Sequence, residues 1–328
     1  MRRATVGTSS EGRLPSLDGA TGWLNSPPLA ASDLLGKVVV FDFCTYTCIN
    51  WLRSLPYVRA WAEKYDEHGL VTIGVHTPEF SFEHDVENVR EMLASMRVEF
   101  PIALDNDYGV WDAFANHYWP ALYFVDAQGR IRHHRFGEGD YERSEEVIQD
   151  LLDEAGADVG TGLVSVSPSG PEVQADWKDL QTTETYLGYR QTMDFASPGG
   201  MTHERPRVYE GPGHLEVNHW SLSGDWTVGA EGIVLNEPKG RIELAFHARD
   251  VHLVMGPATR GTAVPFRVSL DGRPLGDAAG SDADVEGAGV VSQQRMHQLV
   301  RQPEPILDRV FSIEFLDPGA EAFAFTFG

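Results

Sequence analysis

The sequence predicts two domains of different class: an α/β domain followed by an all-β antiparallel sandwich of the jelly-roll type. Two patterns along the 328 residues support this prediction. Residues 37–156 alternate apolar runs of strand length with segments of helical period, whereas residues 183–328 show only a two-residue alternation. A stretch rich in glycine, serine and proline separates the two patterns and is typical of a linker. The expected domains are therefore 1–156 and 183–328, with the linker at 157–182.

In the α/β domain, apolar runs predict strands and helical spacing predicts helices. A polar segment rich in Gly, Pro and Ser, residues 1–35, precedes them. The predicted strands are 37–43, 70–76, 100–105 and a pair around a Gln-Gly turn within 121–137. The predicted helices are 49–66, 82–96, 107–116 and a closing helix that stops at Gly156.

In the second domain, apolar residues occupy every other position between turn residues. The alternating segments are RIELAFHA, VHLVMG, PFRVSLDGRPLG, VFSIEFLDPG and AFAFTFG. Such period-two runs predict strands with one face in a core, and hence an antiparallel sandwich or barrel. Trp220 and Trp226 in this domain are either core residues or aromatic platforms for a sugar.

Composition narrows the function. A formal net charge of −23 argues against binding to nucleic acid or to an anionic membrane. No apolar run is long enough for a transmembrane segment, and two cysteines exclude a disulfide framework. No Cys/His spacing fits a zinc site, so we expect no metal centre and no cofactor. The N-terminus MRRATVGTSSEGRLPSL lacks the apolar run of a secretory signal, which predicts a cytoplasmic protein, or a periplasmic one if a signal or anchor precedes it.

The strongest functional signal is the stretch VVVFDFCTYTCINW. Asp42 ends a predicted buried strand, and Cys48 follows six residues later at the start of a predicted helix that contains Pro56. Trp119 and Pro120 precede a later strand. The N–H groups and dipole at a helix N-terminus favour a thiolate, so we expect the pKa of Cys48 to lie below roughly 8.5.

This combination resembles the thioredoxin family, in its TlpA-like or redoxin branch. Together with segments of the second domain such as NHWSLSGDWTV and FRVSLDGRP, it is similar to the C-terminal part of DipZ-type cytochrome c biogenesis proteins. The resemblance runs from about residue 13 to the end. It implies that Cys48 attacks a disulfide, that Pro120 is a cis-proline that docks an extended chain, and that Asp42 is a buried proton-relaying acid. It also implies a sandwich similar to a carbohydrate-binding module.

The chain departs from the family at one position, because Trp51 stands where the Cys-x-x-Cys pattern has its second cysteine. Resolving a mixed disulfide within the chain requires a second thiol. Trp51 shares the helix face of Cys48, so its ring could cover the sulfur. Cys44 is either a substitute resolving thiol or a small residue that fills a strand-end pocket, and a relaxed bridge to Cys48 requires Cα atoms about 4.4–6.8 Å apart.

A second chemistry is conceivable at the same sulfur. Thr45-Tyr46-Thr47-Cys48 resembles the end of the peroxiredoxin pattern, in which a threonine and an arginine hold peroxide against one cysteine. The candidate arginines are Arg53, Arg130 and Arg132.

Three hypotheses follow. The first is a thiol-based redox protein of the thiol-disulfide oxidoreductase class, acting on a protein thiol or disulfide or a small thiol. The others are a one-cysteine peroxidase and a non-catalytic binding module that has lost its dithiol. Thr45, Tyr46, Trp51 and Trp119 are the expected neighbours of the sulfur. A partner protein or a carbohydrate is the expected ligand of the sandwich.

Overall fold

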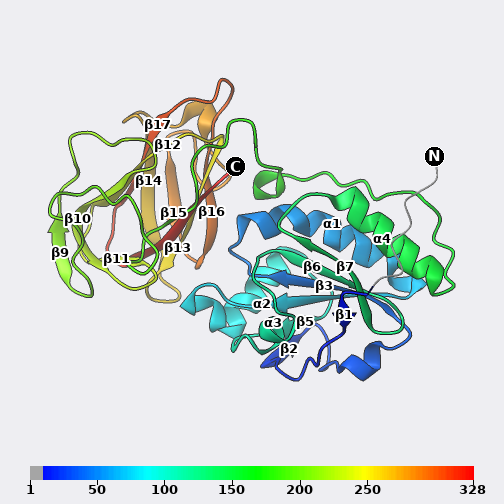
Figure 1. Cartoon of the computed structure of the whole chain (residues 1–328). Helices are drawn as coiled ribbons and strands as arrows, with labels where there is room; N and C mark the ends of the chain where they lie inside the picture. Colours follow the sequence, from blue (N-terminus) through cyan, green and yellow to red (C-terminus); the bar gives the residue numbers. More distant parts are fainter. Residues whose placement is uncertain (1–9) are drawn as a thin grey trace. The chain divides into compact units, whose positions relative to one another are not determined.

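The computed structural model describes residues 10–328 and divides between Glu172 and Val173 into two compact units (Figure 1). Each unit is described by itself. Residues 1–9 lie outside the described residues. They are the start of the expected first domain and of its polar N-terminal segment. The expected domain boundaries stay a prediction.

A seven-stranded sheet forms the centre of the first unit, in the order β1-β7-β6-β3-β4-β5-β2. Strands β3, β4 and β5 are parallel, whereas β6 and β7 run antiparallel to their neighbours. The strands are β1 Gly12–Arg13, β2 Gly22–Leu24, β3 Val38–Cys44, β4 Leu70–His76, β5 Ile102–Leu104, β6 Ala121–Val125 and β7 Arg130–Phe136. This confirms the α/β fold class.

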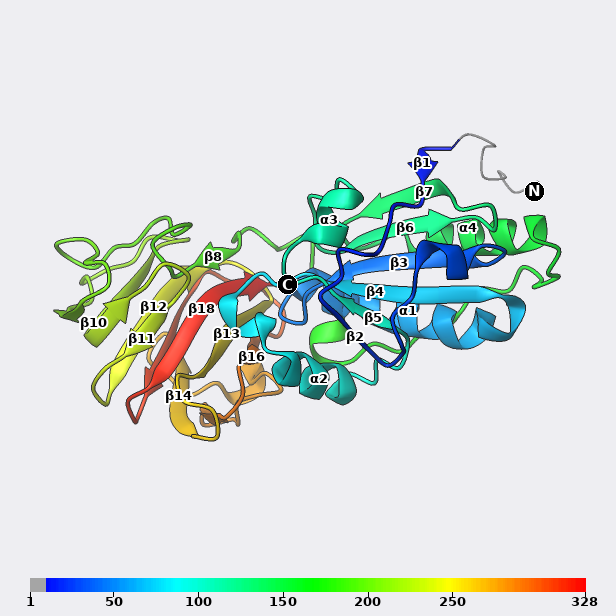
Figure 2. The same cartoon turned by 90° about the horizontal axis from the view of Figure 1, so that it is seen from below.

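Helices cover both faces of this sheet. They are α1 Ile49–Tyr65, α2 Val86–Ser95, α3 Gly109–Ala113 and α4 Tyr141–Glu154, with 3₁₀ turns at Ala31–Leu34, Asp66–His68, Ser81–His84 and Gly170–Glu172. Figures 1 and 2 show α1 and α4 together on one face and α3 on the other. The period of two along β3 turns Phe41 and Phe43 toward α3, where they pack with Trp111 and Phe114. Asp42, between them, therefore faces α1.

The segment 157–172, expected to belong to a linker, contacts the helices of the first unit. The carbonyl of Gly162 accepts hydrogen bonds from Lys64 Nζ and Gln149 Nε2. The N–H of Val164 donates to the carboxylate of Glu145, 2.9 Å away. This half of the segment is therefore bound to α1 and α4.

The second unit is an antiparallel sandwich of two sheets that share β10, which confirms the predicted fold class. The strands run β15-β14-β17-β12-β10-β11-β18-β13-β16, with β8 beside β18 and β9 beside β10. They are β8 Thr185–Tyr186, β9 Pro206–Tyr209, β10 Trp220–Val228, β11 Ile233–Leu235, β12 Gly240–Phe246, β13 Asp250–Pro257, β14 Val264–Leu270, β15 Ala288–Val291, β16 Arg295–Arg301, β17 Arg309–Phe315 and β18 Ala320–Phe327.

The two candidate sugar platforms lie in the core between these sheets. Trp220 and Trp226 have no exposed surface, and their indole N–H groups donate to the carbonyls of Met193 and Ser223. They are core residues, so the interpretation of these two tryptophans as sugar-stacking residues is wrong. Among residues 10–328, no helix has the length and apolar character needed to cross a membrane.

Candidate active site

Cys48 is the N-cap residue of α1 and has an extended backbone, with φ −73° and ψ 115°. Its N–H donates to the Thr45 carbonyl at 3.2 Å, and its carbonyl accepts from the N–H of Leu52 at 3.0 Å. The side chain is half-buried. Cys48 thus lies at the start of α1 and is only partly buried.

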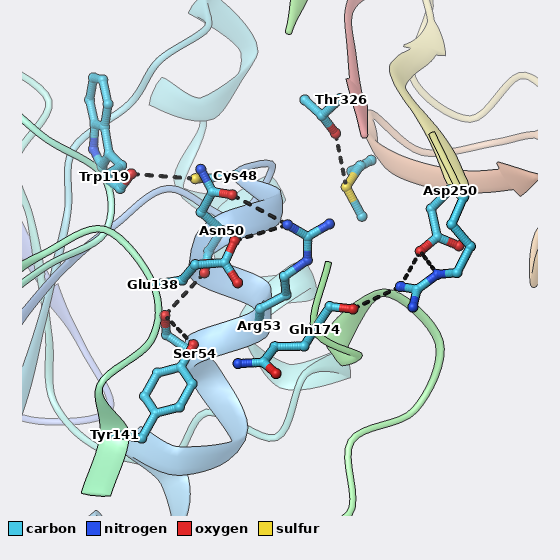
Figure 3. Close-up of polar contacts among 12 residues, drawn as sticks. Cys48, Asn50, Arg53, Ser54, Trp119, Glu138, Tyr141, Gln174, Asp250 and Thr326 are labelled. Atoms are coloured by element: carbon cyan, nitrogen blue, oxygen red, sulfur yellow. Dashed lines mark hydrogen bonds and ion pairs between the residues drawn. The ribbon is translucent and has the colours of Figure 1, made fainter. Parts of the chain in front are cut away.

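The Trp119–Pro120 loop faces this sulfur. The peptide bond between the two residues is cis, as expected. Cys48 Sγ lies 3.9 Å from the Trp119 carbonyl oxygen, a contact drawn in Figure 3. The Trp119 ring packs on Trp111 with centroids 4.4 Å apart, whereas the preceding Tyr118 is exposed. The backbone carbonyl of Trp119 is therefore the part of this loop that lies beside the Cys48 sulfur.

Trp51 points into the protein. Its side chain has no exposed surface, and its indole N–H donates to Asp42 Oδ2 at 2.8 Å. Burial raises the pKa of Asp42 to about 7, against the opposing effect of the Trp51 hydrogen bond. The other carboxyl oxygen of Asp42 has no partner among the described residues. The side chain at the second-cysteine position is therefore a hydrogen-bond donor to the buried acid.

Cys44 is fully buried beneath this site. Its Sγ lies 3.5 Å from the Val75 carbonyl, and neither Cys44 nor Cys48 is in a disulfide. Burial, with the nearby Asp42 and Glu83 carboxylates, raises the pKa of Cys44 well above its usual range. A thiol held neutral is a poor nucleophile. This geometry favours Cys44 as a pocket-filling residue over Cys44 as a resolving thiol.

Tyr46 lies in the core with His76, a residue that sequence analysis did not single out. The two rings stack with centroids 5.6 Å apart and planes 18° apart, and both side chains are fully buried. Burial lowers the pKa of His76 to about 3, so its imidazole is neutral at physiological pH. Burial also raises the pKa of Tyr46. The loop before Cys48 is therefore packed through two stacked, uncharged rings, those of Tyr46 and His76.

A second unpredicted residue, Glu83, binds the same loop. It is fully buried, and its Oε1 accepts from Thr45 Oγ1 at 2.5 Å and Thr47 Oγ1 at 2.7 Å. Burial raises the pKa of Glu83, while its hydrogen bonds oppose that shift. The sequence offers no signal that singles out Glu83, because Glu79 and Asp85 lie close to it in the chain.

Two family models match the chain. The model described as the AhpC/TSA family matches residues 22–134, and the model described as the thioredoxin-like C-terminal domain matches residues 182–328. The thiol-disulfide oxidoreductase YkuV of Bacillus subtilis is 30% identical over 142 residues, which cover 43% of this chain and 95% of YkuV. The chain belongs to the thioredoxin-like family of thiol-disulfide oxidoreductases.

Longer proteins of this thioredoxin-like family are also similar. Protein DipZ of Mycobacterium tuberculosis is 39% identical over 266 residues, which cover 80% of this chain. The match spans only 37% of the length of DipZ. A solved thioredoxin-like protein in its oxidised form is 28% identical, with a TM-score of 0.40 and coverage of 43% of this chain and 96% of that one. The expected similarity to DipZ-type proteins is confirmed, whereas that of the sandwich to carbohydrate-binding modules stays a prediction.

Within this thioredoxin-like site, the groups that a peroxidase would need are already engaged. The Thr45 hydroxyl donates to Glu83. Arg53 Nη1 lies 2.9 Å from Glu138 Oε1, an ion pair visible in Figure 3. Arg130 and Arg132 are both paired with a carboxylate of β-hairpin residue Asp126. Each candidate arginine thus binds a carboxylate, which argues against a role in holding peroxide beside Cys48.

No group of three or more His, Cys, Asp or Glu side chains between residues 10 and 328 is arranged to hold a metal ion.

Proposed function

We propose that the protein performs thiol-disulfide exchange with a single cysteine, Cys48. One observation carries the proposal: Cys48 is half-buried at the N-terminus of α1, while the second-cysteine position holds the buried Trp51. The N–H groups of the first helical turn and the helix dipole favour a thiolate at this place. The first step of exchange needs only that sulfur.

The cycle has two steps. The Cys48 thiolate attacks one sulfur of a substrate disulfide, forms a mixed disulfide with it, and releases the other sulfur as a thiolate that takes up a proton. An external thiolate then attacks the substrate sulfur of the mixed disulfide and releases Cys48. Each step exchanges one S–S bond for another, so the cycle needs no oxidant or reductant besides the substrate disulfide and the external thiol. Trp51 has no thiol, which makes the second step intermolecular.

The surrounding residues have supporting roles in this proposal. The Trp119 carbonyl beside the Cys48 sulfur supports docking of an extended substrate chain along the Trp119–Pro120 loop. Asp42 holds a proton near neutral pH, since burial raises its pKa to about 7. Thr45 and Tyr46 belong to the loop that carries Cys48, and both are buried.

The partners in this proposal are a protein disulfide as substrate and a small or protein thiol as reductant. Both compartments allowed by the sequence, cytoplasmic and periplasmic, can supply such a pair. A partner protein or carbohydrate on the sandwich is a separate hypothesis.

The test is a stoichiometry with 5,5′-dithiobis(2-nitrobenzoate), an aromatic disulfide that releases a coloured thiolate. We expect rapid release of about one equivalent per chain and a mixed disulfide on Cys48 in the mass spectrum, because a monothiol site stops after the first step. Added thiol then releases the second equivalent and regenerates Cys48. The C44S variant should behave like the native chain, and C48S should lose the rapid phase.

Two results would contradict the proposal. Release of both equivalents without added thiol, with a chain lighter by two hydrogens, would identify Cys44 as a resolving thiol. Alkylation of Cys48 no faster than that of free cysteine at neutral pH would leave the non-catalytic binding module as the function.

A further inference from the structure

The carboxyl group of Glu83 joins two loops that are far apart in the sequence. Oε1 accepts from the hydroxyls of Thr45 and Thr47 in the loop between β3 and α1. Oε2 accepts from the N–H groups of Glu79 at 2.7 Å and Phe80 at 3.0 Å, in the loop after β4. One side chain therefore takes up four donors.

The two threonine hydroxyls and the Glu83 carboxyl group have little access to water. Thr45 and Glu83 have no exposed surface, and Thr47 is 1% exposed. Without Glu83, the two hydroxyls would be left buried and unsatisfied, a state that proteins avoid. The β3–α1 loop would have to move to satisfy them.

Cys48 is coupled directly to this loop. It follows Thr47 in the chain, and its N–H donates to the Thr45 carbonyl at 3.2 Å. A backbone hydrogen bond also joins the two loops: the N–H of Thr77, which follows β4, donates to the carbonyl of Cys44 at the end of β3, 3.0 Å away. A shift of the loop would therefore change where the start of α1 holds the sulfur.

We propose that Glu83 is a positioning residue for Cys48: it fixes the β3–α1 loop so that the thiol sits at the N-cap of α1. The proposal deepens the proposed function, on which it rests for the role of Cys48. Glu83 acts through the two threonines and takes no part in bond exchange.

The effect of Glu83 must come from its geometry, because a negative charge close to a thiolate disfavours the thiolate. Glutamine separates the two contributions. Its amide oxygen can accept from the N–H groups of Glu79 and Phe80, and its NH₂ group can donate to the Thr45 and Thr47 hydroxyls, which also accept. E83Q thus removes the charge and keeps the hydrogen bonds to the two loops, whereas E83A removes both the charge and the hydrogen bonds.

The test is the pH profile of Cys48 alkylation by iodoacetamide in the full chain, read by peptide mass spectrometry below the unfolding temperature. We expect E83A and the double variant T45V/T47V to move the alkylation midpoint up by about one pH unit, a tenfold loss of thiolate at neutral pH. E83Q should alkylate at least as fast as the native chain. The matched control is T72V, since Thr72 is a buried β4 threonine whose hydroxyl has no partner among the described residues.

A purely structural Glu83 would lower the melting temperature and leave the profile of the folded protein unchanged, which would overturn the proposal. E83Q as slow as E83A would overturn it too, because charge would then be the cause. If E83A does not fold, the threonine variants carry the test. Failure of the exchange stoichiometry would instead overturn the proposed function, since the alkylation profile requires no disulfide substrate.

Discussion

Asp42 is a carboxyl group whose proton affinity is set by burial. Burial raises its pKa from 3.8 to about 7, and the Trp51 N–H opposes the shift. A folded-state pKa above the unfolded value means that the folded protein holds the proton more tightly. The resulting stabilisation is complete below about pH 4, declines as the pH rises, and is lost above about pH 7. The difference between the two pKa values corresponds to about 4 kcal/mol.

The D42N variant tests this dependence, because asparagine keeps an oxygen for the Trp51 N–H and cannot titrate. We expect the free energy of unfolding of the native chain, relative to D42N, to fall by about 4 kcal/mol between about pH 3 and about pH 8. Denaturant unfolding at a series of pH values measures it. D126N is the control of opposite sign: burial would raise the pKa of Asp126, but hydrogen bonds from Arg130 and Arg132 lower it. A flat difference between native and D42N proteins would show that Asp42 is not a high-pKa acid.

At the residue scale, local spacing places Asp42 near a strand end, Cys48 at a helix start and Pro120 before a strand. Their expected roles come from the resemblance of this combination to the thioredoxin family. The direction of the Trp51 side chain is not predictable in this way, because helical spacing assigns a residue to a helix face and does not identify its hydrogen-bond partner in the core. Glu83 is also beyond local reasoning, since its threonine partners lie 38 and 36 residues away in the chain.

The first turn of α1 is the element in which this chain differs from a dithiol protein. Cys48 occupies the N-cap position, and Trp51 in that turn is buried and hydrogen-bonded to Asp42. In the W51C variant, the introduced thiol would share the helix face of Cys48. We expect a disulfide between Cys48 and the introduced cysteine, with two equivalents of chromophore released from the aromatic disulfide.

This substitution also carries a stability cost, because it replaces a fully buried indole with a small side chain. Truncation of a buried tryptophan costs about 3–5 kcal/mol, measured as the free energy of unfolding. W51F is the matched control: it keeps most of the volume, removes the hydrogen bond that lowers the pKa of Asp42, and leaves exchange at one equivalent. If W51C folds and still releases one equivalent, the first turn of α1 does not hold the two positions as a dithiol pair.

At the element scale, strands with a strong apolar pattern are predictable, whereas short or weakly patterned strands and the ends of helices are not. The sequence-based strands omit β1, β2, β8, β9, β10, β11, β15 and β16. The apolar run at 70–76 coincides with β4. The predicted helix 82–96 is instead a 3₁₀ turn, Ser81–His84, followed by α2. The break occurs because the side chain of Asp85 accepts from the Glu87 N–H and caps α2. The apolar period continues across that cap, so periodicity alone cannot reveal it.

At the scale of the whole molecule, each unit has its own core. A cluster of the first unit draws on residues from Leu17 to Ile131, and a cluster of the second on residues from Leu187 to Phe327. The two clusters share no residue. Since a domain is stabilised chiefly by its own buried apolar surface, we expect the second unit to fold alone.

The segment 173–182 decides which fragment of the second unit is stable. His247 makes three hydrogen bonds to it: its carbonyl accepts from the N–H groups of Gln181 at 3.0 Å and Thr182 at 3.2 Å, and its own N–H donates to Thr182 Oγ1 at 2.7 Å. The Gln174 carbonyl accepts from Arg249 Nη2 at 2.7 Å. We therefore expect a 173–328 fragment to unfold cooperatively, and a 183–328 fragment to be less stable by roughly 2–4 kcal/mol, at about 1 kcal/mol for each lost hydrogen bond.

Denaturant unfolding followed by tryptophan fluorescence measures both fragments, because Trp220 and Trp226 are buried in the core. T182V in the longer fragment is the matched control, since it removes the side-chain bond to His247 and keeps the chain length; it should cost about 1 kcal/mol. Equal stability of the two fragments would support the sequence-based boundary at residue 183 and would mean that residues 173–182 are held without stabilising the sandwich. A lower stability of the shorter fragment would place those residues in the second domain, because their hydrogen bonds would then be part of its cooperative unfolding.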